Sequence, residues 1–377
     1  MDTTLIDKRG KSIKILFLMQ VPPPVTGASL RNSEIFEIID SSAEYYAKLI
    51  PFNFAKNVSL LSGFSILKVL KAFRISARMI YDLVFFRPQI VYMTPVPHGF
   101  AYYRDIINIL IAKMFRKKMV FHLRPLGFKA QSERNKFYRT INKILFKNTY
   151  VICLSKIVSF DIEGIYNGEC IILNNGIKAV KFEKEKSKNS EPVIMFYSNL
   201  FFAKGIVDFL ELLSILKQEG VKFRGQIYGQ EGDISVDDLN NLINRFGLSV
   251  DVSYHGKVNG NEKYKILYSS DIFVFPTHNE NFPGVILEAM QASVPVVSVY
   301  EGSIPEIVVD GETGFLKEKG DNEGLAERVK FLIENPEIRE KMGRKGRERF
   351  LNFYTHEKFE RNISKIFRSI VNSKKLY

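Results

Sequence analysis

Cysteine and clustered metal ligands are scarce in this sequence. Only two cysteines, Cys153 and Cys170, occur in 377 residues. Two cysteines can form neither a disulfide framework nor a four-cysteine zinc site, so a reducing compartment is expected. The sequence also has no Asp-x-Asp pair and no cluster of histidine and cysteine. We therefore predict that the protein holds no metal ion.

Long apolar segments are missing too. The two longest stretches without Lys, Arg, Asp or Glu are residues 15–30 and 88–103, each of 16 residues and each interrupted by prolines. A membrane-spanning helix needs about 20 consecutive apolar residues, so neither stretch is expected to cross a bilayer. The first 14 residues are polar and charged, unlike a signal peptide. These features predict a cytoplasmic protein.

Acidic residues are rare in the first half of the chain. Residues 1–190 hold 30 basic and 14 acidic residues, whereas the remainder holds 24 and 27. The excess is densest between residues 53 and 147, with 18 basic residues and three acidic ones. Such asymmetry favours an anionic partner, either a membrane surface or a nucleic acid; the alternative is a soluble protein that is merely cationic. No nucleic-acid motif occurs in the basic half, so we predict the membrane.

Short apolar runs alternate with helical patterns along the chain, which predicts an α/β protein of two domains. Buried strands are predicted at residues 14–19, 89–93, 119–123, 151–154, 193–197, 272–275 and 295–299, and helices at 28–39 and 106–115. The loop after the first strand lacks the G-x-G-x-x-G pattern, so an NAD site is not expected. Ligands of doubly wound sheets bind at the carboxyl ends of strands, beside helix N-termini that attract phosphate.

The stretch from Asp271 to Leu316 places two glutamates near such a strand end. Glu280 lies in the loop after the strand at 272–275, and Glu288 lies in the helix that follows Pro283. We expect both carboxylates to flank one crevice. The two glutamates are part of E-N-F-P-x-x-x-L-E-A-M, which is followed by P-V-V and by P-E-I-V-x-D-G-x-T-G-F-L.

This composite motif resembles the retaining glycosyltransferases of family 4. The resemblance covers the whole chain, more closely from residue 193 onward. It implies the GT-B fold, with two facing doubly wound Rossmann-like domains and an interdomain cleft. The boundaries that we expect are an acceptor-side domain at 1–186 and a donor domain at 187–356, joined by a charged linker at 181–190. An amphipathic helix at 357–377 is expected to pack back on the first domain.

The resemblance also implies which residues bind the donor. Glu280 would orient the donor sugar and Glu288 would bind the ribose. Asn199 stands where the family has an arginine for the diphosphate, so Lys204 and the helix start would bind that group. The predicted donor-binding residues are Gly27, Asn199, Lys204, Gly229, Glu280, Asn281, Phe282, Pro283, Gly284 and Glu288.

Two polar residues, His122 and Arg124, follow each other at alternate positions where a predicted strand ends. In the family, a histidine near this strand end contacts the transferred sugar, and either residue could take that place. We therefore predict His122, Arg124, Glu280 and Lys204 as the catalytic residues. His122 could instead be a structural histidine, and His98 is a weaker candidate.

The predicted function is the retaining transfer of a sugar from a UDP- or GDP-sugar, without a cofactor, to a lipid-linked glycan acceptor. Cell-surface polysaccharide synthesis (lipopolysaccharide, O-antigen or capsule) fits an enzyme that is peripheral on the inner face of the cell membrane. Attachment would depend on charge, because most rings among Phe64, Phe73, Phe85 and Phe86 are expected in the core. The alternatives are a nucleotide-sugar epimerase of the same fold and a basic nucleic-acid-binding protein. The sugar, nucleotide, linkage and oligomeric state are not predicted.

Overall fold

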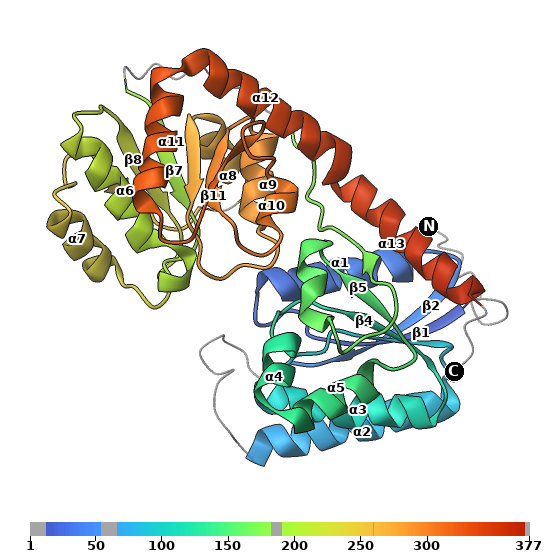
Figure 1. The fold of residues 1–377 in the computed structure, drawn as a ribbon. Helices are drawn as coiled ribbons and strands as arrows, with labels where there is room; N and C mark the ends of the chain where they lie inside the picture. The colour runs from blue at the N-terminus through green and yellow to red at the C-terminus, as the bar shows by residue number, and fades with distance from the viewer. Residues whose placement is uncertain (1–12, 54–65, 182–190, 259, 374–377) are drawn as a thin grey trace, which may run out of the picture. The chain divides into compact units, whose positions relative to one another are not determined.

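The computed structural model describes residues 13–53, 66–181, 191–258 and 260–373. It forms two compact units (Figure 1). Unit 1 comprises residues 1–174 and 359–377, and unit 2 comprises residues 175–358. The chain thus changes unit after Asn174, ahead of the boundary expected at 186. All but the first residue of the expected linker at 181–190 lie outside the described residues.

Unit 1 is built on a parallel sheet of six strands in the order β2-β1-β3-β4-β5-β6. Its inner strands are continuous apolar runs because helices cover both faces of a parallel sheet. The strands are β1 Ile13–Met19, β2 Tyr45–Pro51, β3 Ile90–Met93, β4 Lys118–His122, β5 Thr149–Cys153 and β6 Ile171–Ile172.

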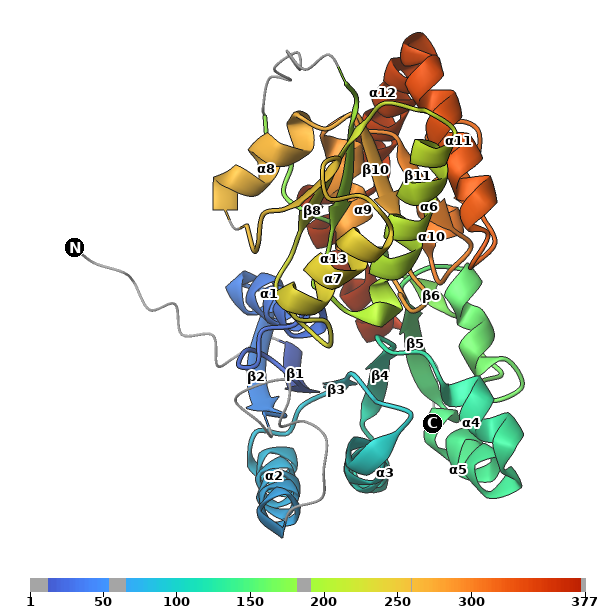
Figure 2. The same ribbon diagram turned by 90° about the vertical axis from the view of Figure 1, so that its left-hand side faces the viewer.

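Two layers of helices cover this sheet (Figures 1 and 2). One face carries α1 Gly27–Ser41 and α13 His356–Asn372, and the other carries α2 Ile66–Phe85, α3 Gly99–Met114 and α5 Lys136–Phe146. The short helix α4 Phe128–Arg134 and the 3-10 helix η2 Ile157–Ile162 complete the unit. Helix α3 begins seven residues before the predicted start at 106.

The C-terminal helix α13 belongs to the core of unit 1. Its apolar side is buried against β1, β3, β4 and β5 through Phe359, Ile363, Ile366, Phe367 and Ile370. The Lys118 ammonium group donates hydrogen bonds of 3.0 Å to the carbonyl oxygens of Ile370, Val371 and Ser373. Because these carbonyls have no partner within the helix, Lys118 caps the end of α13.

Unit 2 contains a second parallel sheet of six strands, in the order β12-β11-β10-β7-β8-β9. The strands are β7 Val193–Tyr197, β8 Arg224–Tyr228, β9 Val252–Tyr254, β10 Ile272–Phe275, β11 Val296–Val299 and β12 Gly314–Lys317. The strand order reverses between β7 and β10. In doubly wound sheets, ligands bind at this switch point, beyond the carboxyl ends of the strands.

The helices of unit 2 connect these strands or, for the last two, follow β12. They are η3 Phe202–Lys204, α6 Ile206–Gln218, α7 Val236–Arg245, α8 Gly260–Tyr268, α9 Gly284–Gln291, α10 Ile304–Ile307, α11 Asn322–Glu334 and α12 Pro336–Phe353. Two Rossmann-like units with parallel sheets are what the sequence predicts, and the α/β fold class is confirmed.

Candidate functional site

Two loops meet at the switch point of unit 2. The loop after β7 runs through η3 to Gly205, and the loop after β10 begins at Pro276. Gly205 has a φ of +80°, and a Cβ at this position would lie 1.9 Å from the carbonyl oxygen of Pro276. Only glycine tolerates both that conformation and that approach. Gly205 therefore lets the loop carrying Lys204 rest against the loop that carries Glu280.

Lys204 and Glu280 form an ion pair across the switch point. The Lys204 Nζ donates to Glu280 Oε2 at 2.5 Å and to the carbonyl oxygen of Asn279 at 3.1 Å. The two side chains are 25% and 23% exposed, so both can reach a ligand. A lysine offers a point charge to an anion, and a carboxylate accepts hydrogen bonds from hydroxyl groups. The arrangement is therefore suited to a molecule with both phosphate and hydroxyl groups.

A second layer of contacts holds the Glu280 loop in place. The Glu280 N–H donates to Glu301 Oε1 at 3.3 Å, and the Ser303 N–H donates to the Asn281 carbonyl at 2.8 Å. Gly302 has a φ of +51°, and a Cβ there would lie 2.1 Å from the Glu280 carbonyl oxygen. Sequence reasoning missed Glu301 and Gly302 as supporting residues, because their contacts with the Glu280 loop span about twenty residues of chain.

Helix α9 starts directly after this loop. Pro283 is its N-cap residue and provides no side-chain hydrogen bond, and Gly284 is exposed. The first N–H groups of a helix carry a partial positive charge and can bind an anion. The Phe282 side chain is buried and contacts the Tyr354 ring edge to face, with centroids 6.1 Å apart. Phe282 was predicted to bind the donor, and because its ring is buried, only its backbone is available to contact a ligand.

Glu288, on α9, forms a separate ion pair. Its Oε1 accepts a hydrogen bond of 2.7 Å from Lys263 Nζ of α8, and the Glu288 side chain is 13% exposed. Tyr197, the last residue of β7, has a pKa raised above its ordinary range, first by burial and then by the charge of Glu288. The sequence predicted Glu288 at the site but did not identify Lys263 as its partner.

Asn199 and Gly229 join the loops that follow β7 and β8. The Asn199 Oδ1 accepts from the Gln230 N–H at 3.3 Å, and the Tyr254 hydroxyl donates to the Gly229 carbonyl at 2.8 Å. Beside them, the Tyr228 ring stacks on His255, with centroids 4.8 Å apart and an interplanar angle of 17°. Asn199 is exposed and carries no charge, so Lys204 is the cation that the structure places in the loop after β7.

In unit 1, His122 ends β4 and is fully buried. Its Nδ1 lies 2.6 Å from the Tyr92 hydroxyl. Burial, assisted by the charge of Arg124, keeps the pKa of His122 well below its ordinary value, so the ring is neutral. Burial also raises the pKa of Tyr92, so its hydroxyl stays protonated and can either donate a hydrogen bond to Nδ1 or accept one from it. If the Tyr92 hydroxyl is the donor, the imidazole proton is on Nε2, which has no hydrogen-bond partner among the described residues.

Arg124 is also buried, and burial lowers its pKa to about 10, with a further decrease from the charge of Arg31. Arg31 lies on α1, whose first residue is Gly27. Gly27 is exposed, and no atom lies within 4 Å of the position of a Cβ. His98 is exposed at the start of α3 and makes no capping hydrogen bond. Unit 1 therefore brings His122, Arg124 and Tyr92 together.

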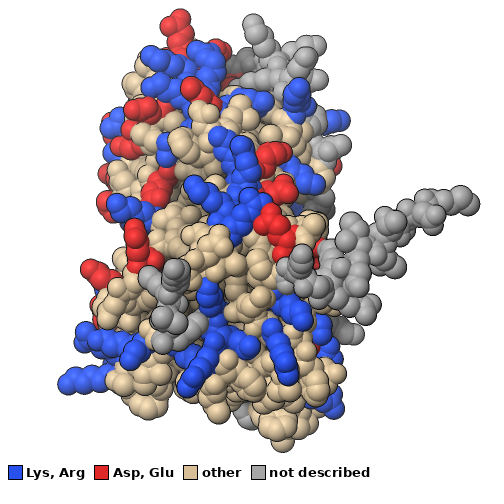
Figure 3. All heavy atoms as spheres, turned by 90° about the vertical axis from the view of Figure 1, so that its right-hand side faces the viewer, with Lys and Arg blue, Asp and Glu red and all other residues tan. Residues whose placement is uncertain are grey.

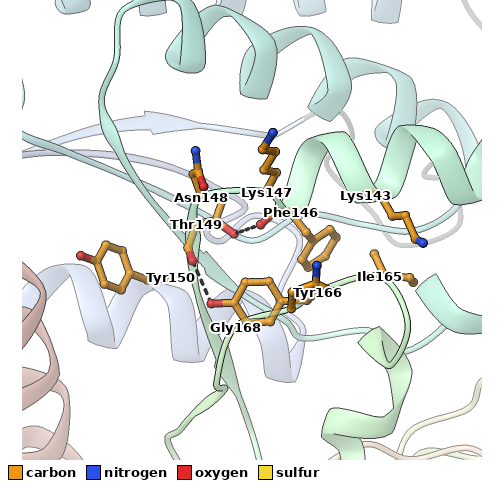
Figure 4. A pocket seen from close by; sticks show the side chains of 10 residues that line it. Lys143, Phe146, Lys147, Asn148, Thr149, Tyr150, Ile165, Tyr166 and Gly168 are labelled. Carbon is orange, nitrogen blue, oxygen red and sulfur yellow. Dashed lines mark hydrogen bonds between the residues drawn. The ribbon is translucent and has the colours of Figure 1, made fainter. Parts of the chain in front are cut away.

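A cavity of about 640 Å³ in unit 1 lies elsewhere (Figure 4). Its wall includes Phe146, Thr149 and Tyr166, and the Tyr166 hydroxyl donates to the Thr149 carbonyl at 2.8 Å. Thr149 begins β5, so the cavity is at the amino ends of the strands and contains no predicted site residue. Within the described parts of the chain, no three His, Cys, Asp or Glu residues are grouped to hold a metal ion.

Comparison with known proteins relates this geometry to a family. Residues 178–349 match the glycosyl transferases group 1. They include the switch point of unit 2 with Lys204, Glu280 and Glu288. CapM of Staphylococcus aureus, a capsular polysaccharide biosynthesis glycosyltransferase, is 29% identical over 194 residues, which cover 49% of this chain and 50% of CapM. The chain thus matches about half the length of that relative.

Solved structures resemble nearly the whole chain. Anabaena HepE in complex with UDP has a TM-score of 0.72 at 19% identity, and the match covers 95% of this chain and 100% of HepE. The lipopolysaccharide outer core galactosyltransferase WaaB has a TM-score of 0.71 at 16% identity, covering 96% and 100%. These likenesses show the fold, and the predicted GT-B fold is confirmed. Together with the family match, they support a glycosyltransferase.

Proposed function

We propose that this chain is a retaining glycosyltransferase that transfers a sugar from a nucleotide-sugar, a UDP-sugar before a GDP-sugar, to a glycan acceptor. The observation that carries the proposal is the Lys204–Glu280 pair at the switch point of the group 1 region. Relatives support the choice of substrate class: HepE is solved with UDP and with UDP-glucose, and CapM is named for capsular polysaccharide.

In this proposal the donor diphosphate takes Lys204 as its partner in place of Glu280. The N-terminus of α9 adds its partial charge, because Asn199 supplies none. Glu280 then accepts hydrogen bonds from the hydroxyl groups of the donor sugar, and Glu288 binds the ribose. Charge that develops on the departing diphosphate would be stabilised by groups already in place, which is usually the largest contribution to such catalysis, and no metal ion is needed.

The acceptor side would use unit 1. His122 presents the proton on Nε2 as a hydrogen-bond donor to the transferred sugar, and Arg124 adds positive charge beside it. Retention would follow from attack on the face from which the diphosphate leaves, so no carboxylate nucleophile is required. A lipid-linked acceptor at the inner face of the cell membrane fits the basic first half of the chain. None of the described helices is both long and apolar enough to span a bilayer.

The test is donor binding by thermal shift, with UDP-, GDP- and ADP-sugars. A donor at 100 times its dissociation constant stabilises the protein by about 2.7 kcal/mol. Lys204→Met removes a charge-assisted hydrogen bond worth about 1.5–3 kcal/mol, which corresponds to a loss of donor affinity of roughly 10- to 150-fold. Lys217→Met is the matched control, because Lys217 is on α6 of the same unit and pairs with Asp251.

Equal donor affinity in the Lys204 variant and the control would remove Lys204 from the site, and stabilisation by no nucleotide-sugar would refute the proposal. An activity assay with and without acceptor completes the test. Sugar conversion that needs no acceptor would favour the epimerase. Inversion of the anomeric configuration, read by NMR of the product, would contradict retention, and loss of activity with EDTA would contradict metal independence.

A further inference from the structure

Helices α2, α3 and α5 form one continuous layer over a single face of the unit 1 sheet (Figure 2). The Ser76 hydroxyl of α2 donates to Asn108 of α3 at 3.1 Å, and the Tyr102 hydroxyl of α3 donates to Asn142 of α5 at 2.8 Å. The inner sides of the helices are buried, for example at Met79 of α2. The outer sides form one surface, which we call the α2–α3–α5 face.

Large apolar side chains line this face at helical spacing. On α3, an exposed stripe at positions i, i+4, i+7 and i+11 consists of Tyr103, Ile107, Leu110 and Met114. Residues 66–74 of α2 include no buried side chain, and the exposed residues there include Ile66, Leu67, Leu70 and Phe73. Phe137 and Ile144 continue the surface on α5. Apolar stripes that point away from the core on adjacent helices mark an interaction surface.

This finding corrects an expectation from the sequence. Most rings in this region were expected in the core, yet Phe73 is 76% exposed and Phe85 is 69% exposed. Phe86 is buried as expected, and Phe64 lies outside the described residues. The physical reason is that α2 buries Ile75, Met79 and Leu83, whereas none of the described residues forms a layer over the exposed apolar side chains of this helix.

The exposed charges on the same face are positive. Each of the two acidic residues in these three helices is buried beside a cation: Asp82 bonds to Lys48 at 2.9 Å, and Asp105 to Arg104 at 2.7 Å. The exposed cations are Lys71, Arg74, Arg78, Lys136, Arg139 and Lys143. In Figure 3, which looks from the right-hand side of Figure 1, Lys and Arg predominate over Asp and Glu in the lower part of the view.

We propose that the α2–α3–α5 face docks on an anionic lipid bilayer, with its apolar side chains inserted at headgroup depth and its cations on lipid phosphates. Apolar side chains flanked by cations are the composition that binds such interfaces. A second copy of the chain fits poorly, since a symmetric contact would bring cations against cations without an exposed carboxylate on these helices to pair with them. The inference names a membrane partner for the proposed glycosyltransferase. It rests on the proposed function only in one respect, which is that the membrane would carry the lipid-linked acceptor.

Insertion and charge are separated by vesicle cosedimentation with phosphatidylcholine alone and with a mixture rich in phosphatidylglycerol. Leu70→Ser with Phe73→Ser should lower affinity for the anionic vesicles by roughly tenfold per side chain, because each removes most of its buried apolar area. Phe353→Ser, an exposed ring on α12 of unit 2, is the matched control and should bind like the wild type. Thermal melting verifies that each variant is folded.

The charge arm compares Lys71→Glu with Arg74→Glu against Lys341→Glu with Arg344→Glu, the same change on α12. Only the first pair should release the protein. Wild-type binding should weaken in about 0.5 M salt, where screening is strong, but should not vanish, since inserted side chains are not screened. Complete release by salt together with normal binding of the ring variant would overturn insertion and leave charge alone.

Other occupants would also show themselves. A dimer without lipid that dissociates in the ring variant would replace the bilayer with a second copy, and tighter binding to duplex DNA than to anionic vesicles would replace it with a nucleic acid. Donor-induced thermal shifts of the wild type separate the two proposals. Failure of the wild type to bind the anionic vesicles together with a normal donor shift would refute only this inference, and vesicle binding without any donor shift would refute only the proposed function.

Discussion

Tyr92→Phe should show whether the hydroxyl group of Tyr92 fixes the state of His122. The change removes one buried hydrogen bond of 2.6 Å and leaves the Nδ1 of a fully buried ring without its donor. An unsatisfied buried acceptor costs about 1–3 kcal/mol, and we expect that loss in the free energy of unfolding. A net hydrogen bond of about 0.5–1.5 kcal/mol also sets the tautomer ratio, so the ratio of the Nε2-protonated form to the Nδ1-protonated form should fall by up to roughly tenfold.

The assays are nitrogen NMR of the His122 side chain, denaturant unfolding and steady-state kinetics. The wild type should show an unprotonated Nδ1 and a protonated Nε2, and the variant should show a mixture. We expect kcat to fall by a larger factor than the donor KM rises, because His122 is proposed to contact only the transferred sugar, whereas the charged residues proposed to bind the rest of the donor are in unit 2. Tyr150→Phe is the control: its hydroxyl is buried in the same unit and has no partner among the described residues. A protonated Nδ1 in the wild type would refute the reasoning.

Two further changes test the supporting structure. Gly302→Ala should abolish most donor binding, because its Cβ would displace the Glu280 backbone. The control is Gly220→Ala, where φ is also positive (+74°) but no atom lies within 4 Å of the new carbon. It should lower the free energy of unfolding by only about 1 kcal/mol of conformational strain and leave donor binding unchanged. Denaturant unfolding and donor titration measure the two effects. Lys118→Met should lower the free energy of unfolding by about 1–3 kcal/mol through lost capping of α13, while the exposed Lys365→Met should leave it unchanged.

Sequence patterns predicted the strands that are apolar throughout but missed the mixed strand β2. The runs at β7 and β10 were placed at their observed bounds. Strand β2 was not predicted, because on an edge strand its residues alternate between buried and half-buried and include Lys48. The start of α3 was missed because Arg104 and Asp105 look solvated in sequence, whereas in the structure they neutralise each other inside the unit.

The sequence predicted individual site residues at strand ends but not the contacts between them. Lys204 and Glu280 were identified separately, but their contact depends on how two loops 76 residues apart approach each other. Tyr92 looked like an ordinary strand residue, and its bond to His122 depends on the pairing of β3 with β4. The roles of all these residues in binding and catalysis remain predictions.

The place of α13 in unit 1 has a consequence for biosynthesis. Unit 2 is one continuous segment, and the ribosome releases all of it before the residues from Phe359 onward. Synthesis of unit 1 begins first, but its core is completed last. The apolar face of β1, β3 and β4 is fully covered only after Ile363 and Phe367 of α13 have been synthesised. During that interval the nascent chain exposes an uncovered sheet face, the kind of surface that chaperones bind. A stop codon only a few turns before the end would make that exposure permanent.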